Sequence, residues 1–178
     1  MCLRAFASVL ALLAVSSAIA TEISPAAVVK TFETYRELNK EFLSAVESGR
    51  SKSGRPYSEI RKAVEEYSEG PFESALTNGV TIVCKSGNAE VIRALFRVIL
   101  ATRHSASESP SSALGQSFMC QPALVSRELR KLSPANLQVM YDTLEFGFHN
   151  AKHDHPLPGV DMSALDAQLR SIAPSQQK

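Results

Sequence analysis

The sequence contains no tryptophan and only three cysteines among its 178 residues. It also lacks an excess of either charge, because 19 Lys and Arg stand against 18 Asp and Glu. Proteins that bind nucleic acid usually carry a basic excess, so this balance argues against that class. It argues equally against a protein that charge holds to a membrane surface. The length fits one domain, and the 44% hydrophobic content predicts a soluble domain with a buried core.

Long apolar runs are scarce, and the single clear one lies at the start of the chain. Residues 1–20 combine a positive residue, Arg4, with an apolar run over 5–15 and small residues at Ala18 and Ala20. This pattern predicts a secretory signal peptide that is cleaved after Ala20, with a buried N-terminal helix as the alternative. The run is too short to span a bilayer. We therefore expect a mature protein with no membrane anchor in an extracytoplasmic space, the periplasm.

Two cysteines, Cys84 and Cys120, remain after that cleavage. Exported chains meet an oxidising environment, so the pair predicts a structural disulfide. The alternatives are a metal pair and a catalytic thiol. A metal pair is disfavoured because neither CxxC spacing nor nearby histidines accompany the cysteines.

Helical signals run along the whole of residues 21–178. Serine followed by proline is a helix start, and it occurs at Ser24 and at Ser133. Asp161 is a further cap, and apolar residues recur at helical spacing between these starts. Val80–Cys84 has a strand-like composition but no partner strand, so we expect it to be helical or extended. The fold class expected is all-α: a single-domain bundle of six to eight helices with one disulfide, frayed over 171–178.

Breaker residues set the expected boundaries. Gly70-Pro71 should end a helix that begins near Ser58, and Asn78-Gly79 should close a short turn after it. The most hydrophobic stretch, Ala89 to about Thr102, should be the central helix. Residues 105–112, which include a proline, should form an exposed polar loop.

Three histidines near the end of a predicted helix are candidate metal ligands. His149 and His153 stand four residues apart, so both imidazoles would lie on one helical face, and His155 would supply a third ligand. The alternative is that they are solvated residues at a helix C-terminus, where cationic side chains are favoured. These two interpretations stay open on the sequence alone.

A basic segment, Gly49–Pro56, lies between the first two predicted helices. It resembles a phosphate loop but lacks Lys and Ser or Thr after its second glycine, and no strand precedes it. We therefore interpret it as an exposed positive loop that solvates the surface or contacts an acidic partner.

No catalytic constellation or cofactor motif occurs in the sequence, so we expect a binding protein without enzymatic activity or cofactor. The whole-chain profile resembles the periplasmic immunity proteins of bacterial type VI secretion systems, especially those that neutralise cell-wall amidases. The resemblance is carried by residues 1–20, the mature size, the helical content and the pair Cys84 and Cys120. It implies a cognate effector, a cell-wall amidase or similar hydrolase, whose active-site cleft the protein blocks. The family is often dimeric, so the resemblance also allows a homodimer.

Two loops are the expected contact points with this partner, because blocking a cleft requires a protruding segment. The alternative function is a periplasmic metal-binding protein that uses the three histidines. The candidate partner-binding residues are Arg50, Lys52 and Arg55 in the first loop and Ser105, Ser107 and Glu108 in the second.

Overall fold

The computed structural model describes residues 23–48, 53–103, 107–154 and 158–174. Within these ranges the chain is all-α, as expected, with eight α-helices, one π-helical segment and no strand. The predicted signal peptide lies outside the described residues. Among the described residues, none of the helices has the length and hydrophobicity that a membrane span requires. The elements are α1 (Pro25–Ser48), α2 (Tyr57–Tyr67), η1 (Ser68–Phe72), α3 (Glu73–Ser86), α4 (Ala89–Ala101), α5 (Ser109–Cys120), α6 (Pro122–Leu129), α7 (Pro134–Asp154) and α8 (Met162–Ser171).

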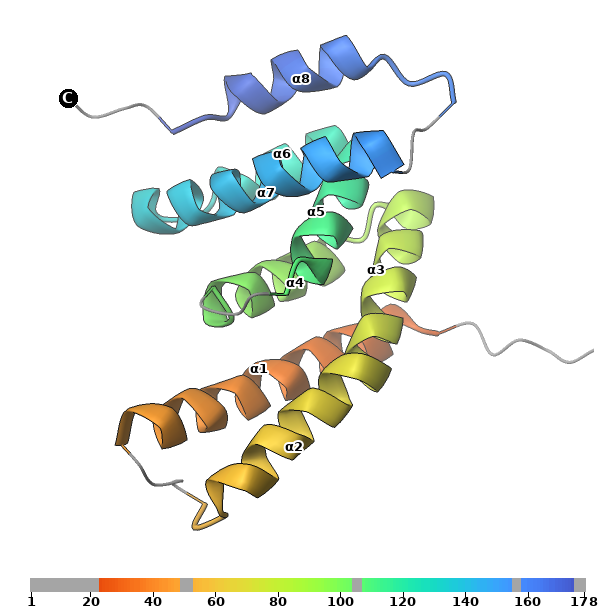
Figure 1. The fold of residues 1–178 in the computed structure, drawn as a ribbon. Coiled ribbons are helices and arrows are strands. Elements are labelled where there is room, and N and C mark those ends of the chain that lie inside the picture. Colours follow the sequence, from red (N-terminus) through yellow and green to blue (C-terminus); the bar gives the residue numbers. More distant parts are fainter. Residues whose placement is uncertain (1–22, 49–52, 104–106, 155–157, 175–178) are drawn as a thin grey trace, which may run out of the picture.

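The helices form one domain around a continuous core (Figure 1). α1 and α2 pair as a hairpin at one end, and α2 continues through η1 into α3. α4 and α5 occupy the middle, while α6, α7 and α8 lie at the end away from the hairpin.

The helix starts follow local cap chemistry. The Ser24 hydroxyl accepts a hydrogen bond from the Ala27 N–H at 3.2 Å. The Asn88 side chain accepts from two N–H groups at the start of α4. The Asp161 carboxylate does the same at the start of α8. α6 and α7 begin at prolines. Proline lacks a backbone N–H, but an N–H at the first position of a helix would have no acceptor within the helix, so no hydrogen bond is lost. These observations confirm the helix starts predicted at Ser24, Ser133 and Asp161.

The predicted break at Gly70-Pro71 is wrong. The chain remains helical there and takes up Pro71 in the π-helical segment η1. Phe72 explains why helical structure persists, because its side chain is fully buried and its ring stacks on Tyr35 of α1 at 3.8 Å between centroids. Burial of this ring outweighs the local preference of the proline for a helix end.

The predicted closure at Asn78-Gly79 is also wrong, because both residues lie inside α3. Gly79 is buried where α3 meets α1 and α4, and a methyl group there would just touch Phe32, Val28 and Val91. The strand-like stretch 80–84 is helical as part of the same helix. α3 ends instead at Gly87, whose φ of +64° is left-handed and suits a residue without a side chain.

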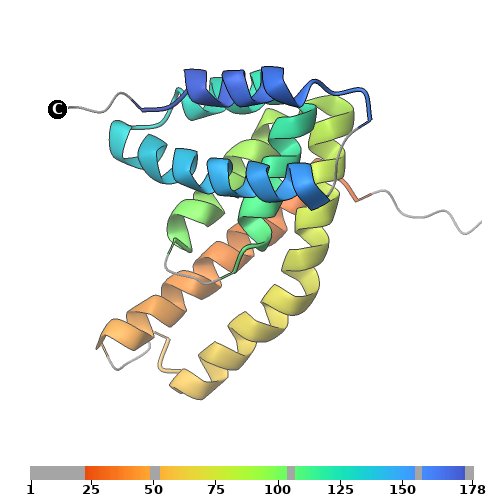
Figure 2. The ribbon, with the colours of Figure 1, turned by 45° about the horizontal axis from the view of Figure 1, so that its top comes forward.

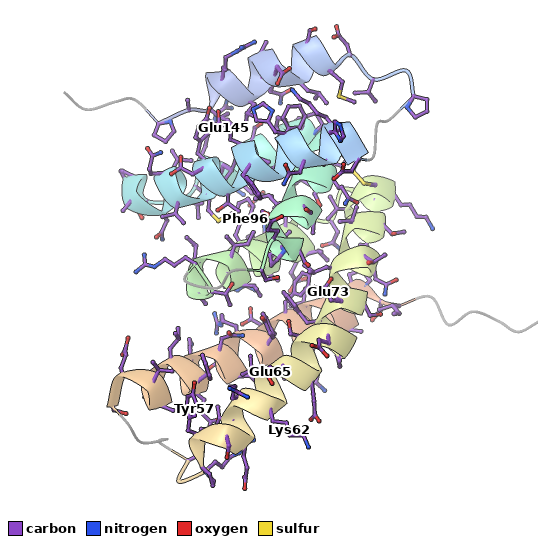
Figure 3. The ribbon with its side chains drawn as sticks, in the orientation of Figure 1. Tyr57, Lys62, Glu65, Glu73, Phe96 and Glu145 are labelled. Atoms are coloured by element: carbon purple, nitrogen blue, oxygen red, sulfur yellow. A yellow bond between two sulfur atoms is a disulfide. The ribbon has the colours of Figure 1, made fainter. Side chains whose placement is uncertain are left out.

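The central position of α4 is confirmed. Most of its side chains are buried, including that of Phe96, which Figure 3 labels in the middle of the molecule. α4 contacts α1, α3, α5, α6 and α7, so it joins the hairpin end to the opposite end of the domain. The buried residues of α4 are Val91, Ile92, Ala94, Leu95, Phe96, Val98 and Ile99.

Part of the predicted polar loop 105–112 is instead the first turn of α5. The helix begins at Ser109, and Pro110 and Ser111 are buried. The Ser111 hydroxyl is satisfied by donating to the Glu108 carbonyl at 2.6 Å, so burying it leaves no unpaired donor. The polar composition of the segment therefore reflects local side chain–backbone bonding.

Two glycines allow α5 and α7 to cross with their backbones in contact. A methyl group on Gly115 would overlap the backbone of Gly147, and one on Gly147 would overlap the carbonyl of Ser111. Glycine inside a helix costs about 1 kcal/mol relative to alanine. The close approach of the two helices accounts for glycine at both positions.

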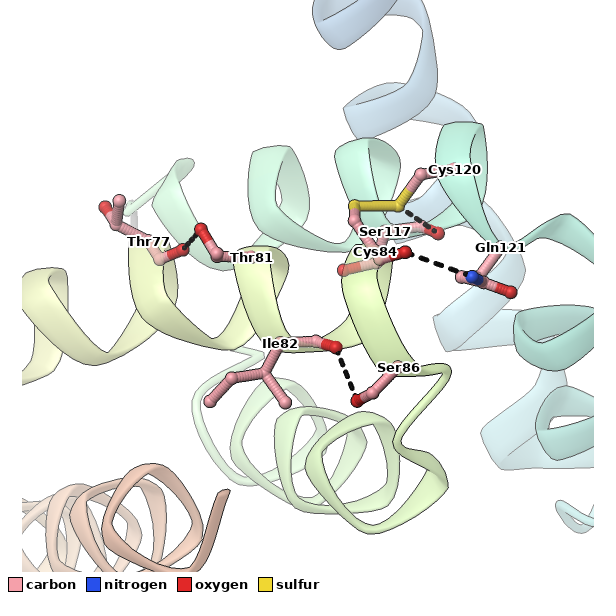
Figure 4. The surroundings of a disulfide bond; sticks show 8 residues. All are labelled: Thr77, Thr81, Ile82, Cys84, Ser86, Ser117, Cys120 and Gln121. Atoms are coloured by element: carbon pink, nitrogen blue, oxygen red, sulfur yellow. Dashed lines mark hydrogen bonds between the residues drawn. A yellow bond between two sulfur atoms is a disulfide. The ribbon is translucent and has the colours of Figure 1, made fainter. Parts of the chain in front are cut away.

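The disulfide between Cys84 and Cys120 is confirmed, and it joins the last turns of α3 and α5 (Figure 4). The two Cα atoms are 5.3 Å apart. Beside the bond, the Gln121 side-chain amide donates to the Cys84 carbonyl at 3.2 Å. The two chain segments that it connects are 36 residues apart in sequence.

Glu128 of α6 is a buried carboxylate whose side chain is only 1% exposed. Lys131 Nζ lies 2.7 Å from the Glu128 Oε2 atom, and Arg93 Nη1 of α4 lies 3.4 Å from the same oxygen. Arg127 Nε lies 3.3 Å from the other oxygen, Oε1. Burial raises the pKa of the carboxyl, but the hydrogen bonds from Lys131, Arg127 and Arg93 outweigh it, so the pKa lies below its ordinary value of 4.5. The carboxylate thus ties α6 to α4.

We expect Glu128→Gln to lower the free energy of unfolding at pH 7 by about 1.5–3 kcal/mol, because charge-assisted hydrogen bonds are lost. The lowered pKa means that the native state holds this proton more weakly than the unfolded state. The stabilisation is therefore complete above pH 4.5 and declines as the pH falls through the native pKa. Urea denaturation of both proteins should give a difference in unfolding free energy that is constant from pH 7 to 5 and becomes smaller below pH 4.5. A difference in unfolding free energy that grows as the pH falls would contradict this account.

Candidate functional site

The loop end of the α1–α2 hairpin extends away from the rest of the molecule (Figure 2). α2 packs chiefly on α1 and on η1, which follows it. Ala45 and Ile60 are buried between the two helices and give the distal part its own small core. At the base, the Tyr35 ring stacks on Phe72 and lies 6.4 Å from the Tyr67 ring. The hairpin is therefore a packed projection anchored by aromatic side chains.

Apolar side chains remain exposed at the end of this projection. Tyr57 is 48% exposed and Val46 is 54% exposed. The Tyr57 ring stacks on Phe42 at 5.6 Å, and Figure 3 labels it near the loop end, between the two helices. We call Phe42, Val46, Arg55 and Tyr57 the hairpin tip. Helical spacing groups Val46 with the apolar face of α1, but more than half of its surface stays exposed to solvent.

Arg55 adds a cation to the hairpin tip. Its guanidinium Nη1 lies 3.4 Å from a carboxylate oxygen of Glu41, and the Ser53 hydroxyl bonds to the other oxygen. Gly54 between them has a φ of +76°, a left-handed conformation that suits glycine. The last part of the loop is therefore held against α1. Arg50 and Lys52 lie outside the described residues.

Of the second predicted segment, Ser107 lies on the flank of the hairpin, whereas Glu108 does not. Ser107 lines a hollow of about 250 Å³ together with Phe42, Leu43 and Val64. Phe42 thus contacts Tyr57 and also borders the hollow that contains Ser107, which connects the tip to this flank. Glu108 instead borders a separate groove of about 370 Å³ between α3 and α5. Ser105 lies outside the described residues.

His149 and His153 are both exposed on the last turns of α7. The His153 Nδ1 lies 2.9 Å from an Asp154 carboxylate oxygen. In the ranges that the structure covers, no group of three His, Cys, Asp or Glu side chains is placed to hold a metal ion. His155 lies outside those ranges, so the three-histidine hypothesis stays a prediction.

Sequence reasoning located the basic loop but missed the aromatic contribution to the tip. The available signal was Tyr57 directly after Arg55-Pro56, a large apolar side chain at a helix start beside a positive loop. It also missed the cluster around Glu128, whose cation Arg93 is 35 residues away in sequence.

Comparison with known proteins returned no family model, no curated protein and no solved structure that matches this chain.

Proposed function

We propose that this chain is an exported binding protein, an immunity protein that inhibits a peptidoglycan-degrading toxin by placing its hairpin tip in the active-site cleft. The observation that carries the proposal is the packed hairpin that projects with Tyr57 and Val46 exposed at its end. The disulfide supports export, because such bonds persist in oxidising compartments.

The hairpin tip has the physical properties that cleft blocking requires. A convex projection complements a concave cleft, and its own packed core limits the conformational entropy lost on binding. Aromatic side chains that become fully covered usually carry much of the binding energy at an interface, and Tyr57 is placed for that role. Arg50 and Lys52, which precede Arg55 of the Arg55–Glu41 ion pair in the sequence, favour a cleft that contains carboxylates.

The function is tested by capture followed by an activity assay. The disulfide-bonded protein is immobilised, exposed to an extract of the cell envelope, and the bound proteins are identified by mass spectrometry. The captured protein is then purified and its cleavage of peptidoglycan is titrated with the chain. We expect a hydrolase that loses activity at a one-to-one ratio. Recovery of no hydrolase, or of one that the chain leaves fully active, would refute the proposal.

Tyr57→Ala should weaken this inhibition by roughly thirtyfold, because a central aromatic anchor contributes about 2 kcal/mol or more. Phe146→Ala is the matched control, since Phe146 is 45% exposed on α7, outside the hairpin. Thermal melts should confirm that both variants stay folded. Equal inhibition by the two variants would place the interface elsewhere.

A further inference from the structure

Three cationic side chains converge on Glu128 at the surface of α4 and α6. Arg93, Arg127 and Lys131 each place a nitrogen within 3.4 Å of the same carboxylate. Their side chains are 47%, 62% and 55% exposed, whereas that of Glu128 is only 1% exposed. The carboxylate therefore lies beneath the cations, and their outer sides face solvent.

The charges in this cluster do not balance. One carboxylate offsets only one of the three cations that contact it. Arg130 adds a further exposed positive charge one residue before Lys131 and forms no ion pair with any described residue. Glu90 lies one turn before Arg93 on α4 but forms no ion pair with it. Positive charges held this close repel one another, and an anion on the solvent side relieves that repulsion.

We propose that Arg93, Arg127, Arg130 and Lys131 form a binding site for a phosphate group, either free or as a monoester. A doubly charged oxyanion suits the site better than a single carboxylate, because several cations share the excess charge. Guanidinium groups offer paired N–H donors to phosphate oxygens, and the ammonium of Lys131 supplies a point charge. Glu128 is a positioning residue that holds three of the cations together before the ligand binds.

The test measures phosphate binding by NMR titration of the full mature chain at low salt, with acetate at matched ionic strength as the monoanion. The test variant is Arg127→Gln/Arg130→Gln, which leaves Arg93 and Lys131 to neutralise Glu128. The control is Lys62→Gln, an exposed cation on α2 that pairs, among the described residues, only with Glu66, one turn further along the same helix. We expect the double variant to bind phosphate about tenfold more weakly than wild type, and the control to change binding by less than about twofold.

Vesicles distinguish the two sources of the phosphate. Cosedimentation with phosphatidic acid vesicles, compared with phosphatidylcholine alone, tests a lipid headgroup. Binding to phosphate and to the anionic vesicles assigns the site to headgroups, whereas binding to phosphate alone assigns it to a soluble ester. The proposal is overturned if wild type binds phosphate no better than acetate, or if the double variant and the control bind phosphate equally well.

Discussion

Gly147→Ala is expected to lower the free energy of unfolding by about 3 kcal/mol or more. The added methyl would overlap the Ser111 carbonyl, which belongs to the backbone of α5 and cannot move as a side-chain end does. Relief requires α5 and α7 to separate along a contact that runs through the core. Urea denaturation followed by circular dichroism at 222 nm measures the loss.

Gly70→Ala provides the control for this experiment. No atom lies within 4 Å of a methyl group at Gly70, and its φ is not left-handed. Alanine should therefore be neutral there or stabilise the helix by up to about 1 kcal/mol. If Gly147→Ala were as stable as Gly70→Ala, the close crossing of α5 and α7 would be wrong.

Removing the disulfide should cost about 3–4 kcal/mol of unfolding free energy. The bond closes a segment with a sequence separation of 36, and its loss releases the unfolded chain from that constraint. The double variant Cys84→Ala/Cys120→Ala isolates this effect, and urea denaturation under non-reducing conditions measures it. Tertiary contacts between α3 and α5 remain, so the variant should keep its helical content at low urea.

A reducing agent gives the internal control for the disulfide. Wild type should lose most of the same stability when reduced, whereas the double variant should be insensitive to the reagent. A loss below about 1 kcal/mol would mean that the crosslink contributes little and that α3 and α5 are held by packing alone.

Local chemistry explains which parts of the fold could be predicted. The caps at Ser24, Asn88 and Asp161 act within three residues of themselves, so their sequence neighbourhood contains the whole signal. The central helix was equally clear, because apolar residues wrap most of its circumference. The disulfide followed from the count of two cysteines left after the predicted signal.

Long-range packing explains two of the boundaries that were predicted wrongly. Gly70-Pro71 is typical of a helix end, but burial of Phe72 against α1 keeps the chain helical through η1. The sequence around Ser111 is typical of an exposed loop, but α7 covers this residue, because the Ser111 backbone packs directly against Gly147. Neither contact is visible within a window of neighbouring residues.

The candidate sites also combine features that are local in sequence with features that depend on the tertiary fold. The position of Arg55 in a loop could be predicted, because turn residues are local properties of the sequence; its role in binding stays a prediction. The exposure of Val46 depends on how far α1 extends beyond the rest of the domain, which no spacing encodes. The cluster around Glu128 needs α4 and α6 to meet, so Arg93 could not be grouped from sequence with Arg127 and Lys131.

The most direct measurement of the central claim is site-specific photo-crosslinking of the hairpin tip to the captured hydrolase. Tyr57 is replaced by benzoylphenylalanine in one protein and Phe146 in another, and both are irradiated with the enzyme. We expect a crosslink from position 57 to residues that line the active-site cleft, and none from position 146. A crosslink from position 146 alone, or one from position 57 to a surface remote from the cleft, would contradict the account.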